Sequence, residues 1–429
     1  MGKKTAISGG EKVREEPFIT VPIIGREEKE QVNEVIDNGI LSGFVANAGE
    51  QFYGGKKVRE FERLFAEHFK IKNAIAVNSA TAGLHAALAA AEIGPGDEVI
   101  VPPYTMSASA TAILMQNAIP VFADIDDRTF CADPASIEKK ITSRTRAIIV
   151  VHLFGQCADM DPIIDMAKKN DLFVIEDCAQ SPGATYKGRA AGTMGDIGVF
   201  SLNQHKIISC GEGGVVTTDN DDLARNVRLV RNHGEVVVDK LGLEEIPPIV
   251  GWNYRMTELE AAVSIAQFKK LEKLTAERKK LASYLTDKLS GFEELNVPYI
   301  PEDNTHVFFV YPITLNLNKL KISRSQFTAA LRAEGIPCGE GYVRPIYLEP
   351  TYREQKAYGV QGCPYKCPLY GKEISYSEGD CPVTENMHYE RLFVLPVCRA
   401  PQTEKDIDDV VSAFEKILYS QDDLAGIDV

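Results

Sequence analysis

From residue 73 onward, the chain alternates between short apolar runs and longer amphipathic stretches. The runs are rich in Val and Ile and lack alternation, which is typical of strands buried on both faces. The intervening stretches repeat apolar positions every three or four residues, as amphipathic helices do. This order predicts an α/β fold with a mostly parallel sheet covered on both faces. The predicted strands are 74–77, 98–102, 120–125, 146–154, 172–177, 198–202 and 213–219, and the helices between the first five are 81–93, 107–117, 134–141 and 160–170.

The last two predicted strands, 198–202 and 213–219, are separated by only ten residues. A helical crossover needs a longer connection, so these two strands are expected to pair antiparallel.

The C-terminal third has a different organisation. Residues 256–290 repeat apolar positions at helical spacing and predict one long helix that leads from a large domain to a smaller C-terminal α/β domain. We expect an N-terminal tail (1–20), a large domain (21–280) and a small domain (281–429). Within the small domain the pattern predicts a strand, two helices and an irregular but ordered insertion, at 305–315, 323–335, 403–418 and 348–390 respectively.

The composition narrows the function classes. The 429 residues are 44% hydrophobic and 25% charged, with a formal net charge of −14. Proteins that bind nucleic-acid backbones usually carry a basic face, so this balance argues against such a partner. No apolar run reaches the 18 residues of a membrane-spanning helix. The expectation is a chain with neither nucleic-acid nor membrane partners.

The cysteines predict a reducing compartment. There are nine in a long chain, which is not the pattern of a disulfide framework, and the polar first residues lack the apolar core of a secretory signal. A cytoplasmic location follows. Cys363, Cys367 and Cys381 form a cluster, but their spacing matches no standard pair of zinc knuckles. Ordinary thiols are favoured there, and no metal site is predicted.

Lys206 is the first candidate for chemistry. It lies in an apolar run that ends in Gly211-Glu212-Gly213-Gly214. A lysine held near a strand end by a glycine turn suits Schiff-base formation with a carbonyl, because it acts as a nucleophile once its amine is neutral. The alternative is a solvated lysine in a surface loop.

Asp177 ends a predicted strand, where open α/β sheets bind ligands. The ring nitrogen of pyridoxal phosphate requires such a carboxylate. Strand pleating points Glu176 and Asp177 to opposite faces, so only one of them can face the ring. The alternative for Asp177 is a helix N-cap.

Two further segments precede predicted helices. Residues 78–83 (Asn-Ser-Ala-Thr-Ala-Gly) place small residues and hydroxyls at a helix N-terminus, which favours an anion such as a phosphate. An ordinary N-cap is the alternative. Residues 251–257 contain the single tryptophan, Trp252, and suit either a binding site or a cap at Thr257.

Together these motifs resemble the DegT-type sugar and cyclitol aminotransferases, a branch of the fold-type I enzymes that use pyridoxal 5'-phosphate. The resemblance covers residues 20–420. The family's lysine motif, Ser-x4-Lys-x4-Gly-Glu-Gly-Gly, is similar to Ser201, Lys206 and 211–214. Its acidic motif is similar to 176–180, its phosphate turn to 80–84, and its Gly-x-Asn-x-Arg-Met-Thr segment to 251–257.

The resemblance implies the family's fold, a mostly parallel seven-stranded sheet in a large domain with a smaller C-terminal domain. It implies a homodimer with shared active sites. It also implies a role for each matched residue: Lys206 as the Schiff-base lysine, Asp177 on the ring nitrogen, Gln180 on the ring hydroxyl, Thr81, Ala82 and Ser201 on the phosphate, and Asn253 reaching the phosphate from the neighbouring subunit.

Two positions differ from the family pattern or lie next to a residue that could replace the lysine. The family usually has an aromatic residue, stacked on the cofactor ring, where this chain has Met106, and either Met106 or the nearby Tyr104 is expected to serve. Some relatives carry histidine in the lysine position and catalyse dehydration. Here the spacing from Ser201 and Gly211 puts Lys206, not His205, in that position, which counts against a dehydrase.

The resemblance predicts a transaminase that moves an amino group from glutamate or glutamine to a ketone on a nucleotide-linked ketosugar. The alternatives are glutamine-dependent amination of a cyclitol ketone of the scyllo-inosose type, a sugar dehydrase, or a cofactor-bound regulator. Acceptor choice is expected to depend on residues 340–385, which offer both cations for a diphosphate and tyrosines for hydroxyls: Arg344, Arg353, Lys356, Lys366, Tyr342, Tyr347, Tyr358 and Tyr365.

Overall fold

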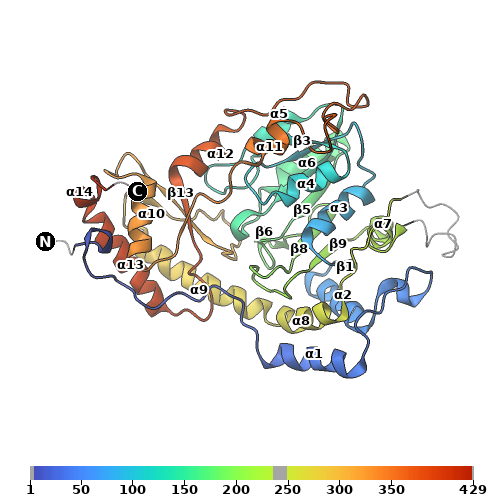
Figure 1. The fold of residues 1–429 in the computed structure, drawn as a ribbon, viewed down its shortest axis with the longest axis horizontal. Helices are drawn as coiled ribbons and strands as arrows, with labels where there is room; N and C mark the ends of the chain where they lie inside the picture. The colour runs from blue at the N-terminus through green and yellow to red at the C-terminus, as the bar shows by residue number, and fades with distance from the viewer. Residues whose placement is uncertain (1–3, 235–248, 428–429) are drawn as a thin grey trace.

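The computed structural model describes residues 4–234 and 249–427, which form two lobes (Figure 1). The larger lobe contains a seven-stranded sheet, as the resemblance predicted, with the strand order β1-β9-β8-β5-β4-β2-β3. Its strands are β1 (Asn73–Val77), β2 (Glu98–Val101), β3 (Ile119–Phe122), β4 (Thr145–Val151), β5 (Phe173–Asp177), β8 (Ile197–Ser201) and β9 (Gly214–Thr218). All seven apolar runs therefore form strands.

The strand directions bring the motifs to one edge of the sheet. β2 pairs parallel with β3 and β4, β4 with β5, and β5 with β8. β9 pairs antiparallel with β8, which confirms the expected pairing, and also with β1. Because β9 runs opposite to both of its neighbours, β1 and β8 run in the same direction. The carboxyl ends of β1, β2, β4, β5 and β8 thus share one edge with the start of β9, and ligands bind at this edge in open α/β sheets.

Helices cover both faces of the sheet. A Cβ on Gly83 of α3 (Ala80–Ala90) would lie 2.8 Å from a methyl of Val199, whereas the rings of Phe65 in α2 (Lys56–Phe69) and Phe200 are 5.0 Å apart. Val199 and Phe200 are neighbours in β8, so α3 and α2 lie on opposite faces. The helices of this lobe are α1 (Arg26–Asn38), α2 (Lys56–Phe69), α3 (Ala80–Ala90), α4 (Ala108–Met115), α5 (Pro134–Lys140), α6 (Met160–Asn170), α7 (Asp221–Arg231) and α8 (Glu258–Phe268), with 3-10 turns at Glu50–Tyr53 and Leu153–Gly155 and a small hairpin of β6 (Thr185–Tyr186) and β7 (Arg189–Ala190).

The prediction of one helix over 256–290 was wrong. The chain forms α8 and then α9 (Leu271–Leu289), with a turn at Lys269 and Lys270. At the turn the amide of Lys270 bonds to the carbonyl of Gln267, three residues back, and the Lys270 ammonium lies 2.6 Å from Glu28 of α1. Periodicity did not reveal the break because apolar residues face the core on both sides of it.

The smaller lobe is built on an antiparallel sheet of order β10-β11-β13-β12. Its elements are β10 (Leu295–Asn296), β11 (Tyr311–Leu315), α10 (Arg324–Ala333), β12 (Gly339–Glu340), β13 (Leu392–Leu395), α13 (Glu404–Leu418) and α14 (Gln421–Leu424), and α9 packs against them. The N-terminal segment also joins this lobe. Phe18 enters its core, and Arg14 lies 2.8 Å from both Asp406 and Asp409. The predicted domain division stays a prediction, and residues 1–3, 235–248 and 428–429 of it lie outside the described residues.

The insertion packs on the larger lobe, although it is contiguous in sequence with the smaller one. The Asp124 carboxylate accepts hydrogen bonds from the amides of Val383 and Thr384 at 2.8 and 2.9 Å, and the Tyr376 hydroxyl donates to the Pro120 carbonyl at 2.7 Å. The segment contains a 3-10 turn, two short helices and a π-helical turn, at Ile346–Leu348, α11 (Pro350–Arg353), α12 (Pro382–Asn386) and Met387–Arg391. In the described ranges, every helix is too short or too polar to cross a bilayer.

Candidate active site

Lys206 follows β8 in a turn that is closed by a hydrogen bond from its backbone amide to the Asn203 carbonyl, at 2.9 Å. Its side chain is half-buried, and its ammonium nitrogen lies 4.8 Å from the centre of the Phe309 ring. Burial lowers the pKa of the Lys206 amine, and the negative charge of Asp177 opposes this shift only in part. The amine therefore becomes neutral more readily than a solvated lysine, as a nucleophile requires.

Asp177 ends β5 and is 4% exposed. One carboxylate oxygen accepts the hydroxyl of Ser109 at 2.8 Å, and the other accepts the amide of Ala179 at 3.1 Å. Turns, not a helix, follow Asp177, so it is not a helix N-cap.

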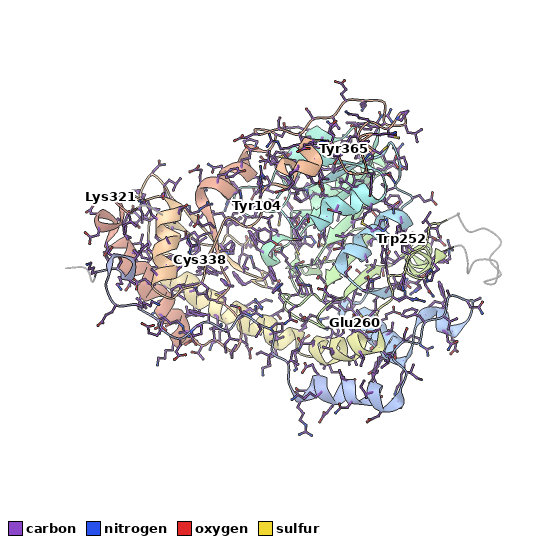
Figure 2. The ribbon with its side chains drawn as sticks, viewed as in Figure 1. Tyr104, Trp252, Glu260, Lys321, Cys338 and Tyr365 are labelled. Carbon is purple, nitrogen blue, oxygen red and sulfur yellow. The ribbon has the colours of Figure 1, made fainter. Side chains whose placement is uncertain are left out.

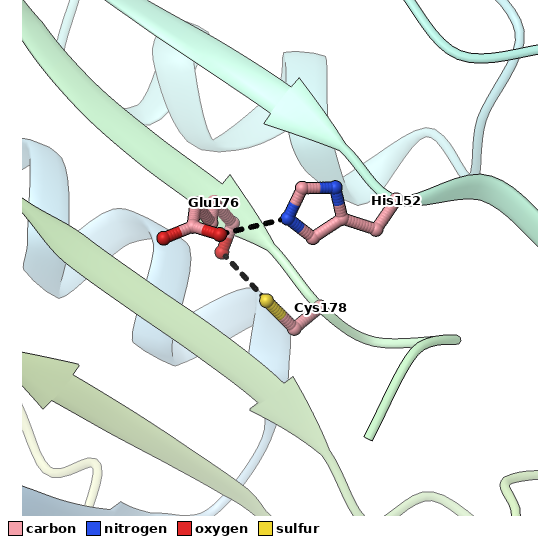
Figure 3. A group of neighbouring side chains, drawn as sticks. All are labelled: His152, Glu176 and Cys178. Atoms are coloured by element: carbon pink, nitrogen blue, oxygen red, sulfur yellow. Dashed lines mark hydrogen bonds and ion pairs between the residues drawn. The ribbon is translucent and has the colours of Figure 1, made fainter. Parts of the chain in front are cut away.

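The pleat of β5 turns Glu176 to the side opposite Asp177. There its carboxylate lies beside His152 and Cys178 (Figure 3). Its buried carboxylate accepts His152 Nε2 at 2.8 Å and the amides of Gly192, Met194 and Gly195 at 2.7–2.9 Å. Burial alone would raise the pKa of Glu176, but these hydrogen bonds outweigh it and hold the pKa below its ordinary value. Glu176 thus fastens the turn at 192–195 behind the strand that carries Asp177.

His152, Glu176 and Cys178 bring possible metal-ligand atoms within 4.8 Å of one another. The group is hydrogen-bonded internally instead. His152 Nδ1 accepts the Ala158 amide at 3.1 Å while Nε2 faces Glu176, and burial raises the pKa of the Cys178 thiol far above its ordinary value. Both imidazole nitrogens are engaged and the thiol stays protonated, so the cluster is suited to structural support.

The segment before α3 has the features of an anion site. Ser79 caps the helix by accepting the Ala82 amide at 3.0 Å, so both the N-cap and the predicted phosphate turn are present in one segment. Thr81 is exposed, and Ser201 lies nearby at the end of β8 with 7% exposure. A Cβ on Gly214 would lie 2.7 Å from the Ala80 nitrogen, so only glycine lets β9 begin this close to the helix. First-turn amides and free hydroxyl donors are what a phosphate requires.

Gln180 bridges the lobes. Its amide oxygen accepts the Phe154 backbone amide, and its nitrogen donates to the Tyr342 hydroxyl, both at 2.8 Å. One hydrogen of its NH2 group remains available for a ligand. Burial raises the pKa of Tyr342 to about 12, so its hydroxyl stays protonated.

Met106 and Tyr104 lie in different environments. Met106 is 56% exposed and lines a cavity of about 730 Å³ with Arg344 and Tyr358. Tyr104 (labelled in Figure 2) is fully buried. Its ring lies edge-on to those of Tyr342 and His388, with centroids 6.1 and 6.0 Å away. Of the two, Met106 is the side chain with a face open to a ligand.

Asn253 lies beside the phosphate turn of its own chain. Its carbonyl accepts the Asn78 side-chain amide at 3.4 Å, and its side-chain oxygen accepts Arg255 Nε at 2.8 Å. Its predicted role across a subunit interface stays a prediction. Thr257 caps α8 in a capping box with Glu260, which confirms the cap in this segment.

Three of these residues were missed from the sequence. Ser109 and Phe309 reach Asp177 and Lys206 from segments far away in the chain, and neither carries a local signal. His152 directly follows a strand at the ligand-binding edge, and that position was a usable signal. Behind Phe309, the buried Arg278 donates to the carbonyls of Phe308 and Phe309 at 2.8 and 3.3 Å and fixes the segment facing Lys206.

The model of the DegT/DnrJ/EryC1/StrS aminotransferase family matches residues 23–365. The chain belongs to this family. Among its relatives, GDP-perosamine synthase of Caulobacter vibrioides is 36% identical over 401 residues, covering 93% of this chain and 98% of that protein. The L-glutamine:scyllo-inosose aminotransferase of Streptomyces griseus is 33% identical over 429 residues, covering 97% and 98%. The crystal structure of an aminotransferase from Psychrobacter cryohalolentis has a TM-score of 0.81 and 31% identity, covering 95% of this chain and 100% of that one.

As a member of this aminotransferase family, the chain is an enzyme with pyridoxal 5'-phosphate as its cofactor. The donor set fits that group. A desolvated amine, an enclosed carboxylate and an anion site at a helix N-terminus lie along one sheet edge, and these are the three groups that the aldehyde, the ring nitrogen and the phosphate require.

Proposed function

We propose that this enzyme transfers an amino group from glutamate or glutamine to a ketone on a nucleotide-linked ketosugar. The observation that carries the proposal is the desolvated amine of Lys206 beside the enclosed Asp177 carboxylate, at the edge that also carries the anion site. Bound pyridoxal phosphate supplies an electron sink and the carbon that carries the amino group.

In this proposal Lys206 would hold the cofactor through its amine, and the same amine would carry the proton that transamination moves between substrate and cofactor. Burial lowers the pKa of this amine, which favours its neutral, proton-accepting form. The ring of Phe309, 4.8 Å away, limits the positions that the amine can take.

The other residues hold the cofactor in place. Asp177 would pair with the ring nitrogen, the free hydrogen of the Gln180 amide would serve the ring hydroxyl, and Met106 would pack on the ring face. Thr81, Ala82 and Ser201 would bind the phosphate. The Ala82 amide is already engaged by Ser79, so its part requires a shared hydrogen bond or a turn of the Ser79 side chain.

The cavity beside Met106 supports a phosphate-bearing acceptor. Of the four cations considered from the sequence, Arg344 is the one that lines it, and it is exposed. Of the four tyrosines, Tyr358 lines it, whereas Tyr347 and Tyr365 are buried in the core. The cavity thus offers one cation, Arg344, but it also carries the carboxylate of Glu349 and the phenols of Tyr352 and Tyr358.

A cyclitol ketone is the second candidate. It is supported by the likeness to the L-glutamine:scyllo-inosose aminotransferase, which extends over 97% of this chain. Such an acceptor is neutral and would not need Arg344.

We further propose a homodimer in the cytoplasm. Exposed apolar side chains near the start of α8, including Val250 and Trp252, would be covered by a second subunit, and Asn253 of the partner subunit would complete the phosphate site. The nine free cysteines are consistent with a reducing compartment.

The test is single-turnover reaction of the amino form of the enzyme with nucleotide-linked ketosugars, inososes and 2-oxoacids, each over a range of salt. A diphosphate acceptor should react more slowly as salt screens Arg344, and Arg344→Gln should remove most of that dependence. An inosose that reacts without salt dependence would favour the cyclitol alternative. Reaction with 2-oxoacids alone would refute both.

A further inference from the structure

We infer that Ser109 is a positioning residue that holds the Asp177 carboxylate in line with the cofactor's ring nitrogen. The inference rests on the proposed function, because it presupposes the role of Asp177. Ser109 is fully buried, and its hydroxyl is 2.8 Å from the nearer Asp177 oxygen. Among the residues that the structure describes, Ser109 is the side chain that donates a hydrogen bond to the Asp177 carboxylate.

The Ser109 proton has one favourable acceptor. The other oxygens within reach, the Met106 carbonyl and the Thr105 hydroxyl, both lie at 3.4 Å, which is long for a hydroxyl donor. An ionised carboxylate is also the stronger acceptor. The hydroxyl therefore donates to Asp177 rather than back to its own helix turn.

Two donors together fix the plane of the carboxylate. Ser109 bonds to one oxygen and the Ala179 amide bonds to the other at 3.1 Å. A carboxylate oxygen accepts more than one hydrogen bond, so a lone pair remains for a ring N–H. Without Ser109, the Ala179 amide would hold the carboxylate at one oxygen only, so the plane of the carboxylate would no longer be fixed.

The hydroxyl itself is held rigidly. Ser109 is in the first turn of α4, and Ala110 and Ile113 of the same helix are fully buried against the larger lobe. Asp177 arrives from β5, 68 residues later in the chain. The docked helix thus gives Ser109 a fixed position. The nearest proposed cofactor contact in the sequence, Met106, lies before the helix begins.

Ser109→Ala tests the inference, with 15N-labelled pyridoxal phosphate bound to the enzyme. The donor favours charge on the carboxylate and hence the proton on the ring nitrogen. Its loss should move the ring-nitrogen chemical shift toward that of an unprotonated ring. The kcat should fall about tenfold to a hundredfold, as for loss of one hydrogen bond to a charged group, with KM for the amino donor changed less than about twofold. Ser109→Thr restores the hydroxyl and should therefore restore both the chemical shift of the ring nitrogen and kcat.

Ser264→Ala is the matched control. Ser264 is equally buried on α8, but its hydroxyl donates to the Glu260 carbonyl of its own helix. It should leave the chemical shift unchanged. If Ser109→Ala does not fold, Ser109→Cys, with a weak donor of similar size, should show the same shift. A wild-type chemical shift and kcat in folded Ser109→Ala or Ser109→Cys would overturn the inference.

Asp177→Asn separates this inference from the proposed function. Ser109→Ala should raise the cofactor dissociation rate in the wild-type background but change it less than about twofold in the Asp177→Asn background, because the charge it supports is gone there. An effect as large as in the wild-type background would overturn the inference. If Asp177→Asn alone keeps the wild-type chemical shift and kcat, the proposed role of Asp177 fails, and this inference with it.

Discussion

Replacing Glu176 by Gln should destabilise the larger lobe. The carboxylate accepts two amides on one oxygen, from Met194 and Gly195, and Gly192 and His152 on the other. A glutamine that keeps its oxygen toward the first pair turns its NH2 group toward two donors. His152 cannot adapt by exchanging its proton, because its second nitrogen already accepts the Ala158 amide.

Two hydrogen bonds to a buried charge are lost in this variant. Each is worth roughly 1.5–3 kcal/mol, so the free energy of unfolding should fall by about 3 kcal/mol or more. The pH dependence should also change. Because the folded-state pKa of Glu176 lies below its ordinary value, the wild type loses this stabilisation as the pH falls below about 4.5, and the variant has none to lose.

Equilibrium urea unfolding followed by circular dichroism measures the change. Asp196→Asn is the control: it is the same chemical substitution in the same turn, but Asp196 is exposed and its side chain accepts a single amide, from Val174. The free energy of unfolding of the Asp196→Asn control should lie within about 0.5 kcal/mol of that of the wild type. Unfolding of Glu176→Gln at the wild-type urea concentration would refute the reasoning.

Lys206→Ala should abolish the visible absorbance of covalently bound cofactor and lower transamination by several orders of magnitude; borohydride reduction and peptide mapping that label another lysine would contradict this. Asp177→Ala should weaken cofactor retention by about 2–5 kcal/mol, measured by dialysis and absorbance, and near-normal retention would argue against the ion pair. Mixing the Lys206→Ala chain with an inactive Asn253 variant should restore some activity if sites are shared between subunits, and no recovery after verified subunit exchange would count against sharing. His306 is buried with its pKa lowered to about 3, so the native state takes up its proton later than the unfolded state and stability should fall as the pH drops from about 6.5. His306→Asn keeps an acceptor for the Phe308 amide and should show a flatter decline in melting temperature over pH 7–4.

The sequence by itself determined the local elements and the candidate chemistry. Seven apolar runs became seven strands because residues buried on both faces leave an unambiguous pattern. The lysine, acidic and phosphate motifs could be located because each depends on spacing within a few residues. The sheet topology then accounts for their meeting at one edge, since β1, β5 and β8 all run in the same direction.

Only the tertiary structure decided which side chains support those motifs. The Ser109–Asp177 and Gln180–Tyr342 contacts join residues 68 and 162 positions apart, and no local pattern encodes such pairs. The break at Lys270 was likewise hidden, because a single turn leaves the apolar faces of α8 and α9 on the core side.

The division between the lobes was also decided by packing. Phe18 joins the core of the smaller lobe, while the insertion that holds Tyr376 packs on the larger one. Burial follows which surfaces come into contact in three dimensions, and contiguity along the chain does not determine that. Packing also decided between Met106 and Tyr104: the sequence left both open as the side chain at the cofactor ring, but only Tyr104 is enclosed by rings from the C-terminal part of the chain.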